Sequence, residues 1–280
     1  MAIPTDRVTG RAPLAWLESL LRQVQMVVRG ERTIRSLARL FTLILGLSGV
    51  AWGAATFPIF WSQVPIERTA AAIVDRAAFK PRSLEPLLPA VDQIEKSGYC
   101  QPEALHNAAI IRLRLADDAV TNAERDAIDT QLGALQDAIR RSLACAPADP
   151  FLWMTLAWLD QMRQGYRPEQ LTYLRLSYEL GPYEGWIADR RNRQALSMFD
   201  RLPPDLADDV IREFAGMVRS GFYVDVISIL TGPGWPIHAR LLAGLKDVDV
   251  HQREELAKEL NSAGYDVAVP GIAPTVPRPW

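Results

Sequence analysis

The chain has 280 residues, of which 49% are hydrophobic and 23% charged, so it is long enough to bury a core of its own. Its net charge of −2 conceals an asymmetry. Residues 1–39 carry seven arginines against three acidic side chains, whereas residues 40–280 carry 24 basic and 30 acidic side chains. This acidic main part lacks the basic surface that nucleic-acid binding requires, so we expect no nucleic-acid partner.

Residues 1–39 form a basic segment that contains an amphipathic pattern. Between residues 13 and 30, leucines and valines recur on one helical face, while Glu18 and Arg22 lie off that face. The pattern predicts a helix that lies on the surface of a lipid bilayer, with the following arginines reaching anionic headgroups. A helix that binds a partner protein would show the same pattern.

Residues 40–61 are 22 residues without a single charge. A helix needs about 20 apolar residues to cross a bilayer, so this run predicts one transmembrane helix. Because the arginines crowd its N-terminal side, the positive-inside rule places residues 1–39 in the cytoplasm and residues 62–280 outside. A cleaved signal peptide and a buried core helix are alternatives. The preceding 39 residues are too long for a signal peptide, and 22 uncharged residues are long for a core helix.

Small residues lie within the predicted span. Gly49 and Gly53 form a GxxxG motif, and Gly46 lies one turn earlier. Such residues let two membrane helices approach closely, so they predict a contact face for a homo-oligomer or for docking on a larger membrane protein. The motif is also common by chance in spans rich in Gly and Ala.

Residues 62–268 show apolar side chains at helical spacing and no convincing strand alternation, which predicts an all-α domain. Gly133 is a candidate break in one of the helices, and Asp249 a candidate cap of the last. Residues 269–280 hold four prolines and predict an extended or disordered tail. Helices are expected over 65–79, 83–97, from Pro102, from Thr121 to Cys145, and near 151–164, 168–180, 184–199, 204–219, 223–230, 236–246 and 250–263.

Two segments of this domain repeat at an offset of 35 residues. Ser142 aligns with Ser177, and Pro147 aligns with Pro182. The spacing is close to the 34 residues of a tetratricopeptide repeat. Between the two segments, the residues Trp153, Leu156, Gly165 and Tyr166 stand at positions that resemble the family's pattern.

Residues 148–182 therefore resemble one tetratricopeptide-type hairpin, and residues 130–147 resemble the second helix of the hairpin before. The match is partial, since Asp160 stands where an aromatic is usual and Gln170 replaces a small alanine. The resemblance implies a degenerate stack of helices with a concave surface for protein binding. An irregular helical bundle with a chance repeat is the alternative.

The two cysteines, Cys100 and Cys145, fall at the start of one predicted helix and the end of the next. In an antiparallel hairpin these ends are neighbours, and an extracytoplasmic domain permits a disulfide, so we expect a bridge between Cys100 and Cys145. A mismatch in helix length could keep them apart unless Gly133 breaks the second helix.

Catalytic and metal-binding patterns are not found, so we expect neither an enzyme, nor a metal site, nor a cofactor. The histidines His106, His238 and His251 have no ligand spacing, and His106 is expected to be hydrogen-bonded in the core or a groove. One cluster combines arginine forks with aromatic rings, which suits a carboxylate, phosphate or sugar ligand but is more typical of internal salt bridges and packing. Its candidate binding residues are Tyr173, Tyr183, Trp186, Arg190, Arg191 and Arg193.

Together these features predict a non-enzymatic scaffold or adaptor, anchored in the inner membrane of a bacterial envelope, whose periplasmic domain binds protein partners. The layout resembles uncharacterised envelope proteins that accompany surface-polysaccharide assembly. The alternative is a glycan- or lipid-binding accessory protein that uses the region of Trp186 and Arg190. A scaffold predicts a groove lined by uncharged side chains from successive hairpins, whereas a ligand site predicts a closed pocket where arginines and aromatic rings converge.

Overall fold

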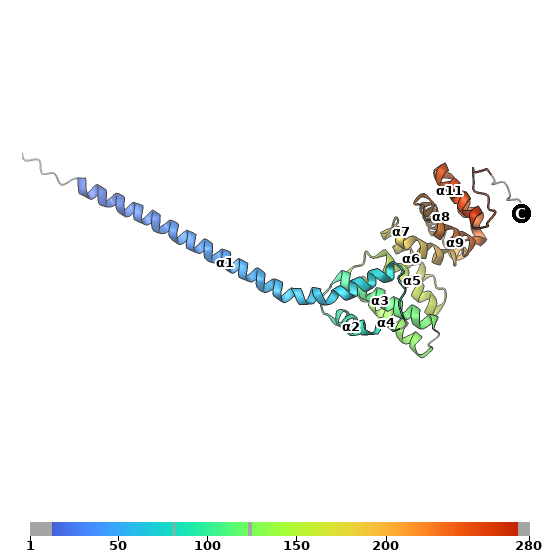
Figure 1. Cartoon of the computed structure of the whole chain (residues 1–280), viewed down its shortest axis with the longest axis horizontal. Helices are drawn as coiled ribbons and strands as arrows, with labels where there is room; N and C mark the ends of the chain where they lie inside the picture. Colours follow the sequence, from blue (N-terminus) through green and yellow to red (C-terminus); the bar gives the residue numbers. More distant parts are fainter. Residues whose placement is uncertain (1–12, 81, 123–124, 274–280) are drawn as a thin grey trace, which may run out of the picture. The chain divides into compact units, whose positions relative to one another are not determined.

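The computed structural model describes residues 13–80, 82–122 and 125–273 (Figure 1). Within these ranges every regular element is a helix, which confirms the all-α prediction. The chain divides into two units, Met1–Val64 and Pro65–Trp280.

The first unit consists of the greater part of α1 (Pro13–Val74), a helix of 62 residues. Its segment Ser36–Pro58 is long and apolar enough to cross a membrane, in agreement with the span expected at residues 40–61. Hydroxyls of this segment, such as that of Thr42, donate to carbonyls one turn earlier, so they remain hydrogen-bonded in apolar surroundings. The side chains of residues 13–35 lie outside the described set, and the amphipathic face stays a prediction.

The helices expected separately over 40–61 and 65–79 are one element. α1 runs through Pro58 and Pro65 and ends at Val74, and the chain then turns at Arg76, which has a left-handed φ of 60°. Each proline removes one backbone donor, and the helix bonds on either side continue the element.

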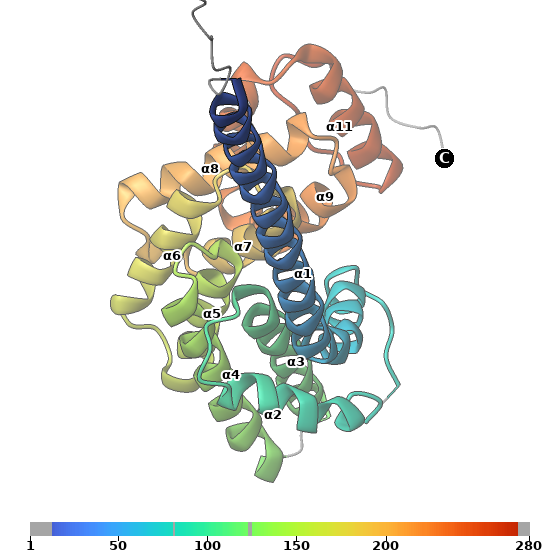
Figure 2. The same cartoon turned by 90° about the vertical axis from the view of Figure 1, so that its left-hand side faces the viewer.

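The second unit places its helices in chain order, from α2–α4 through α5–α6 to α7–α11, as Figures 1 and 2 both show. The hairpins α3–α4, α5–α6 and α7–α8 follow one another, and α4 also packs on α5. Short 3₁₀ turns lie at Glu85–Leu87, Phe199–Arg201, Trp235–Ile237 and Gly244–Asp247. The helices are α2 (Leu88–Lys96), α3 (Pro102–Thr121), α4 (Arg125–Cys145), α5 (Pro150–Gln164), α6 (Glu169–Leu180), α7 (Gly185–Leu196), α8 (Pro204–Arg219), α9 (Tyr223–Thr231), α10 (His238–Ala243) and α11 (Val250–Ser262).

These bounds confirm most of the predicted helices, with four corrections. The helix expected over 83–97 is α-helical only over Leu88–Lys96, and the helix expected over 236–246 is a short α-helix, His238–Ala243, between two 3₁₀ turns. α4 is continuous through Gly133, so this glycine does not divide the helix. The helix expected over 184–199 ends at Leu196, and a 3₁₀ turn follows it.

The α5–α6 hairpin is closed by small and polar groups. Ser177 is fully buried, and its hydroxyl donates to the Pro150 carbonyl at 2.7 Å. Gly181 lies so close to Pro150 that an added Cβ would stand 2.6 Å from its ring, which only glycine avoids. Gln170 is buried and donates to the carbonyl of Gly165 at 2.6 Å. A hydrogen bond across the connecting loop therefore occupies the place where the resembled repeat has a small alanine.

The cysteines Cys100 and Cys145 lie at disulfide-bonding distance, with Cα atoms 5.4 Å apart. The two helices of this hairpin match in length, because α3 has 20 residues and α4 has 21. The start of the first helix therefore meets the end of the second.

The predicted tail begins with packed residues. Val269 is buried, and Arg253 of α11 donates to the Pro270 carbonyl at 2.5 Å. The first residues of the segment 269–280 thus belong to the helical domain, while residues 274–280 lie outside the described residues.

Candidate binding pocket

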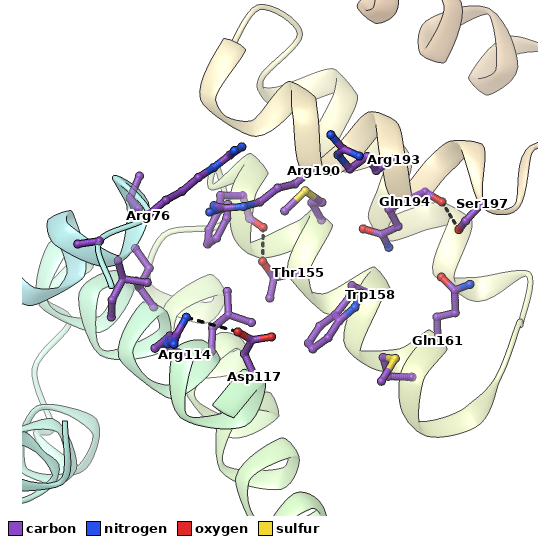
Figure 3. A pocket seen from close by; sticks show the side chains of 18 residues that line it. Arg76, Arg114, Asp117, Thr155, Trp158, Gln161, Arg190, Arg193, Gln194 and Ser197 are labelled. Carbon is purple, nitrogen blue, oxygen red and sulfur yellow. Dashed lines mark hydrogen bonds and ion pairs between the residues drawn. The ribbon is translucent and has the colours of Figure 1, made fainter. Parts of the chain in front are cut away.

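A pocket of about 870 Å³ lies in the second unit, formed by the end of α1 and by α3, α5 and α7 (Figure 3). These three helices are the first helices of the three successive hairpins. The volume of the pocket falls within the range of about 300–1,000 Å³ typical of ligand sites.

The floor of the pocket is mostly aliphatic. Phe151 and Met154 are buried beneath it, whereas Met162 at its edge keeps 49% of its surface exposed. The pocket is therefore an open groove over an apolar base. The apolar lining comprises Ile73, Val74, Ala77, Ile110, Leu113, Phe151, Met154, Trp158 and Met162.

Four arginines and one acidic residue, Asp117, also line the pocket, so its polar lining is strongly cationic. Three of the arginines form ion pairs with carboxylates, and Arg76 also lies 3.7 Å from Asp225. Arg76 and Arg193 both bind Asp189, at 2.6 and 2.7 Å, and Arg114 binds Asp118 at 2.8 Å.

Arg190 is the fourth arginine, and it forms no ion pair with any residue in the described ranges. Its guanidinium lies half-buried, 6.0 Å from the centre of the Phe151 ring. Burial and then the charge of Arg76 lower the pKa of Arg190, while the charges of Asp189 and Asp117 offset part of this effect. Figure 3 shows the Arg76 and Arg190 side chains on the same side of the pocket. The site thus holds a partly desolvated positive charge beside another positive charge.

Two buried nitrogens of the lining lack hydrogen-bond partners among the described residues. They are the Nε atom of Arg114 and the Nε2 atom of Gln194. In the remainder of the described chain, the buried atoms without a partner are all oxygens, and none of them lines the pocket.

The lining hydroxyls and its acidic group are already engaged. Thr155 donates to the Phe151 carbonyl at 2.8 Å, and Ser197 donates to the Gln194 carbonyl at 2.7 Å. Asp117 lies 3.6 Å from Arg114, which holds it as a counter-ion. The lining offers no base beside a nucleophile.

The six candidate binding residues do not converge on one site. Arg190 and Arg193 line the pocket. Trp186 packs 5.0 Å from Phe151 outside the lining, and Tyr183 is 97% exposed. Tyr173 on α6 stacks on Trp153 at 5.7 Å.

Arg191 belongs to the core instead. Its side chain is 0% exposed and binds the Glu213 carboxylate of α8 through Nε at 2.8 Å and Nη2 at 2.5 Å. Its other donors reach the carbonyls of Ser177 and Gly181, and its guanidinium lies 4.2 Å from the centre of the Tyr178 ring. Burial raises the pKa of the Tyr178 hydroxyl well above its usual value, so it stays neutral and donates to Glu213. This cluster joins α6, α7 and α8.

The remaining candidates lie apart from the pocket. A Cβ built on Gly46, Gly49 or Gly53 meets no atom within 4 Å, so this face of α1 is open in the single chain. His106 contacts the Asp149 carboxylate at 2.5 Å, as expected for a hydrogen-bonded histidine. Within the described residues, no group of three His, Cys, Asp or Glu side chains could hold a metal ion.

The residues missed by sequence reasoning are Arg76, Arg114 and Trp158. They stand in three separate segments and come together only when the hairpins stack. Comparison with known protein families, curated proteins and solved structures finds no match to this chain.

Proposed function

We propose that this chain is a membrane-anchored scaffold or adaptor whose helical domain binds a partner protein in the pocket. The main support for this proposal is that α3, α5 and α7, the first helices of three successive hairpins, line one open groove. A degenerate tetratricopeptide-like stack would present its concave surface in this way.

The anchor in this proposal is the Ser36–Pro58 segment of α1. The seven arginines of residues 1–39 favour a cytoplasmic N-terminus, which would place the helical domain in the periplasm of a bacterial envelope. A disulfide between Cys100 and Cys145 would suit that oxidising compartment. A reporter fused after residue 280 should then be active only outside the cytoplasm, and activity only inside would contradict this orientation.

The groove has one feature of each pattern expected from the sequence, since it spans successive hairpins, as a scaffold predicts, and gathers arginines, as a ligand site predicts. Its mostly aliphatic lining favours a protein partner over a sugar, which would need flat aromatic faces and paired polar groups. The alternative of a glycan- or lipid-binding accessory protein rests on the region of Trp186 and Arg190. Both side chains lie against the Phe151 ring, but only Arg190 lines the pocket.

Affinity purification from detergent-solubilised membranes tests this proposal. The wild-type chain should recover a stoichiometric partner, and Met162→Glu should lose it because the new charge covers the apolar floor. Leu180→Glu is the matched control, since Leu180 is 40% exposed, lies on α6 and does not line the pocket. Equal recovery by both variants, or no partner with the wild type, would contradict the proposed function.

A further inference from the structure

We infer that the pocket binds an acidic and apolar segment of a partner polypeptide, in which an Asp or Glu carboxylate pairs with Arg190. This inference rests on the proposed function, because it specifies the chemistry of the partner that the groove takes. It follows from the unpaired Arg190 and from the apolar lining of the pocket.

Arg190 of α7 is the pocket arginine without an ion pair in the described part of the chain. Arg76 pairs with Asp189 and Asp225, Arg193 pairs with Asp189, and Arg114 pairs with Asp117 and Asp118. The Arg190 guanidinium is half-buried and is repelled by Arg76. A carboxylate placed between these two would relieve the repulsion and would form a charge-assisted hydrogen bond.

The apolar lining of the pocket favours a polypeptide side chain as the occupant. Met154 and Met162 flank Trp158, and adaptable methionine surfaces suit polypeptide side chains. An acyl chain would need an enclosed tunnel, whereas Met162 is 49% exposed at the edge of an open groove. One apolar side chain beside the acidic residue would cover this floor and displace its water.

The test is selection of a random dodecapeptide library on the full-length chain in nanodiscs, with empty nanodiscs as background. Enriched peptides should carry Asp or Glu within a few residues of an apolar side chain. A synthetic copy of the leading peptide should bind Arg190→Gln at least tenfold more weakly than wild type, about 1.4 kcal/mol. It should bind Arg140→Gln as it binds wild type, because Arg140 is exposed on α4 and outside the pocket.

A folding control accompanies the variants. Arg190→Gln should unfold at the wild-type temperature or above it, so weaker binding by this variant reports the contact and not the fold.

Two results would overturn the inference. Enriched peptides that lack acidic residues, or that bind Arg190→Gln as well as wild type, would contradict the carboxylate while leaving a protein-binding groove in place. No enrichment over empty nanodiscs would contradict the peptide occupant, as would a fluorescent fatty acid that binds in its stead through Arg190. If Met162→Glu also fails to release the partner in affinity purification, the proposed function falls as well.

Discussion

Replacing Arg191 with methionine should destabilise the helical domain strongly. The substitution leaves the Glu213 carboxylate buried without its counter-charge and leaves the carbonyls of Ser177 and Gly181 without a donor. Breaking a buried ion pair from one side costs about 3–5 kcal/mol. For a domain of this size each kcal/mol lowers Tm by about 2–4 °C, so Tm should fall by about 6–20 °C.

Two controls make this prediction specific. The double variant Arg191→Met with Glu213→Leu removes both charges and should recover most of the loss, since an apolar pair can replace a buried salt bridge. Arg190→Met changes the neighbouring residue and should cost nothing or raise Tm, because burial and Arg76 already disfavour its charge. The assay is urea and thermal unfolding of the full chain in detergent, followed by circular dichroism. An Arg191→Met variant within 1 kcal/mol of wild type (about 2–4 °C), or a loss for Arg190→Met of equal size, would refute the reasoning.

Three further predictions concern other parts of the chain. Closing 45 residues between Cys100 and Cys145 should stabilise the domain by about 4 kcal/mol on the chain-entropy model, so thermal unfolding with and without reductant should differ, and Cys145→Ala should abolish the difference. Burial alone would raise the pKa of Asp92, but the hydrogen bond and charge of Arg112 hold it below its usual value. Asp92 therefore adds stability above about pH 4, and this stability is lost as the pH falls through the folded pKa. The free energy of unfolding in urea should fall between pH 7 and pH 3 by less than about 1 kcal/mol more in the wild type than in Asp92→Asn. Gly49→Ile should weaken self-association in a membrane two-hybrid assay with unchanged helicity, and unchanged association would exclude the glycine face.

Helix positions were predictable because local signals fix them. Pro102 opens α3, and the Asp249 carboxylate accepts the backbone N–H of His251 at 2.9 Å, as a cap should. The continuity of α1 was not predictable, because a proline such as Pro65 disfavours a helix interior without forbidding it. Neighbouring helix bonds decide such cases, and they depend on the whole element.

The candidate site was predictable only in part. Residues three apart share a helical face, so the spacing of Arg190 and Arg193 could have separated them from Arg191, which points toward α8. This spacing of three residues can be read from the sequence alone. The contributions of Arg76 and Arg114 could not be predicted, because they depend on how the end of α1 and α3 meet α5 and α7. Long-range packing sets that arrangement, and local periodicity does not encode it.

The most direct test of the protein-binding groove is photo-cross-linking in native membranes. A photoreactive amino acid at Met162 should give a discrete adduct with one partner, and the same amino acid at Leu180 should give none, although the two side chains are similarly exposed. The adduct should fade when Arg190 is replaced by Gln. Identical adducts from Met162 and Leu180, or no adduct from Met162, would contradict a partner-binding groove.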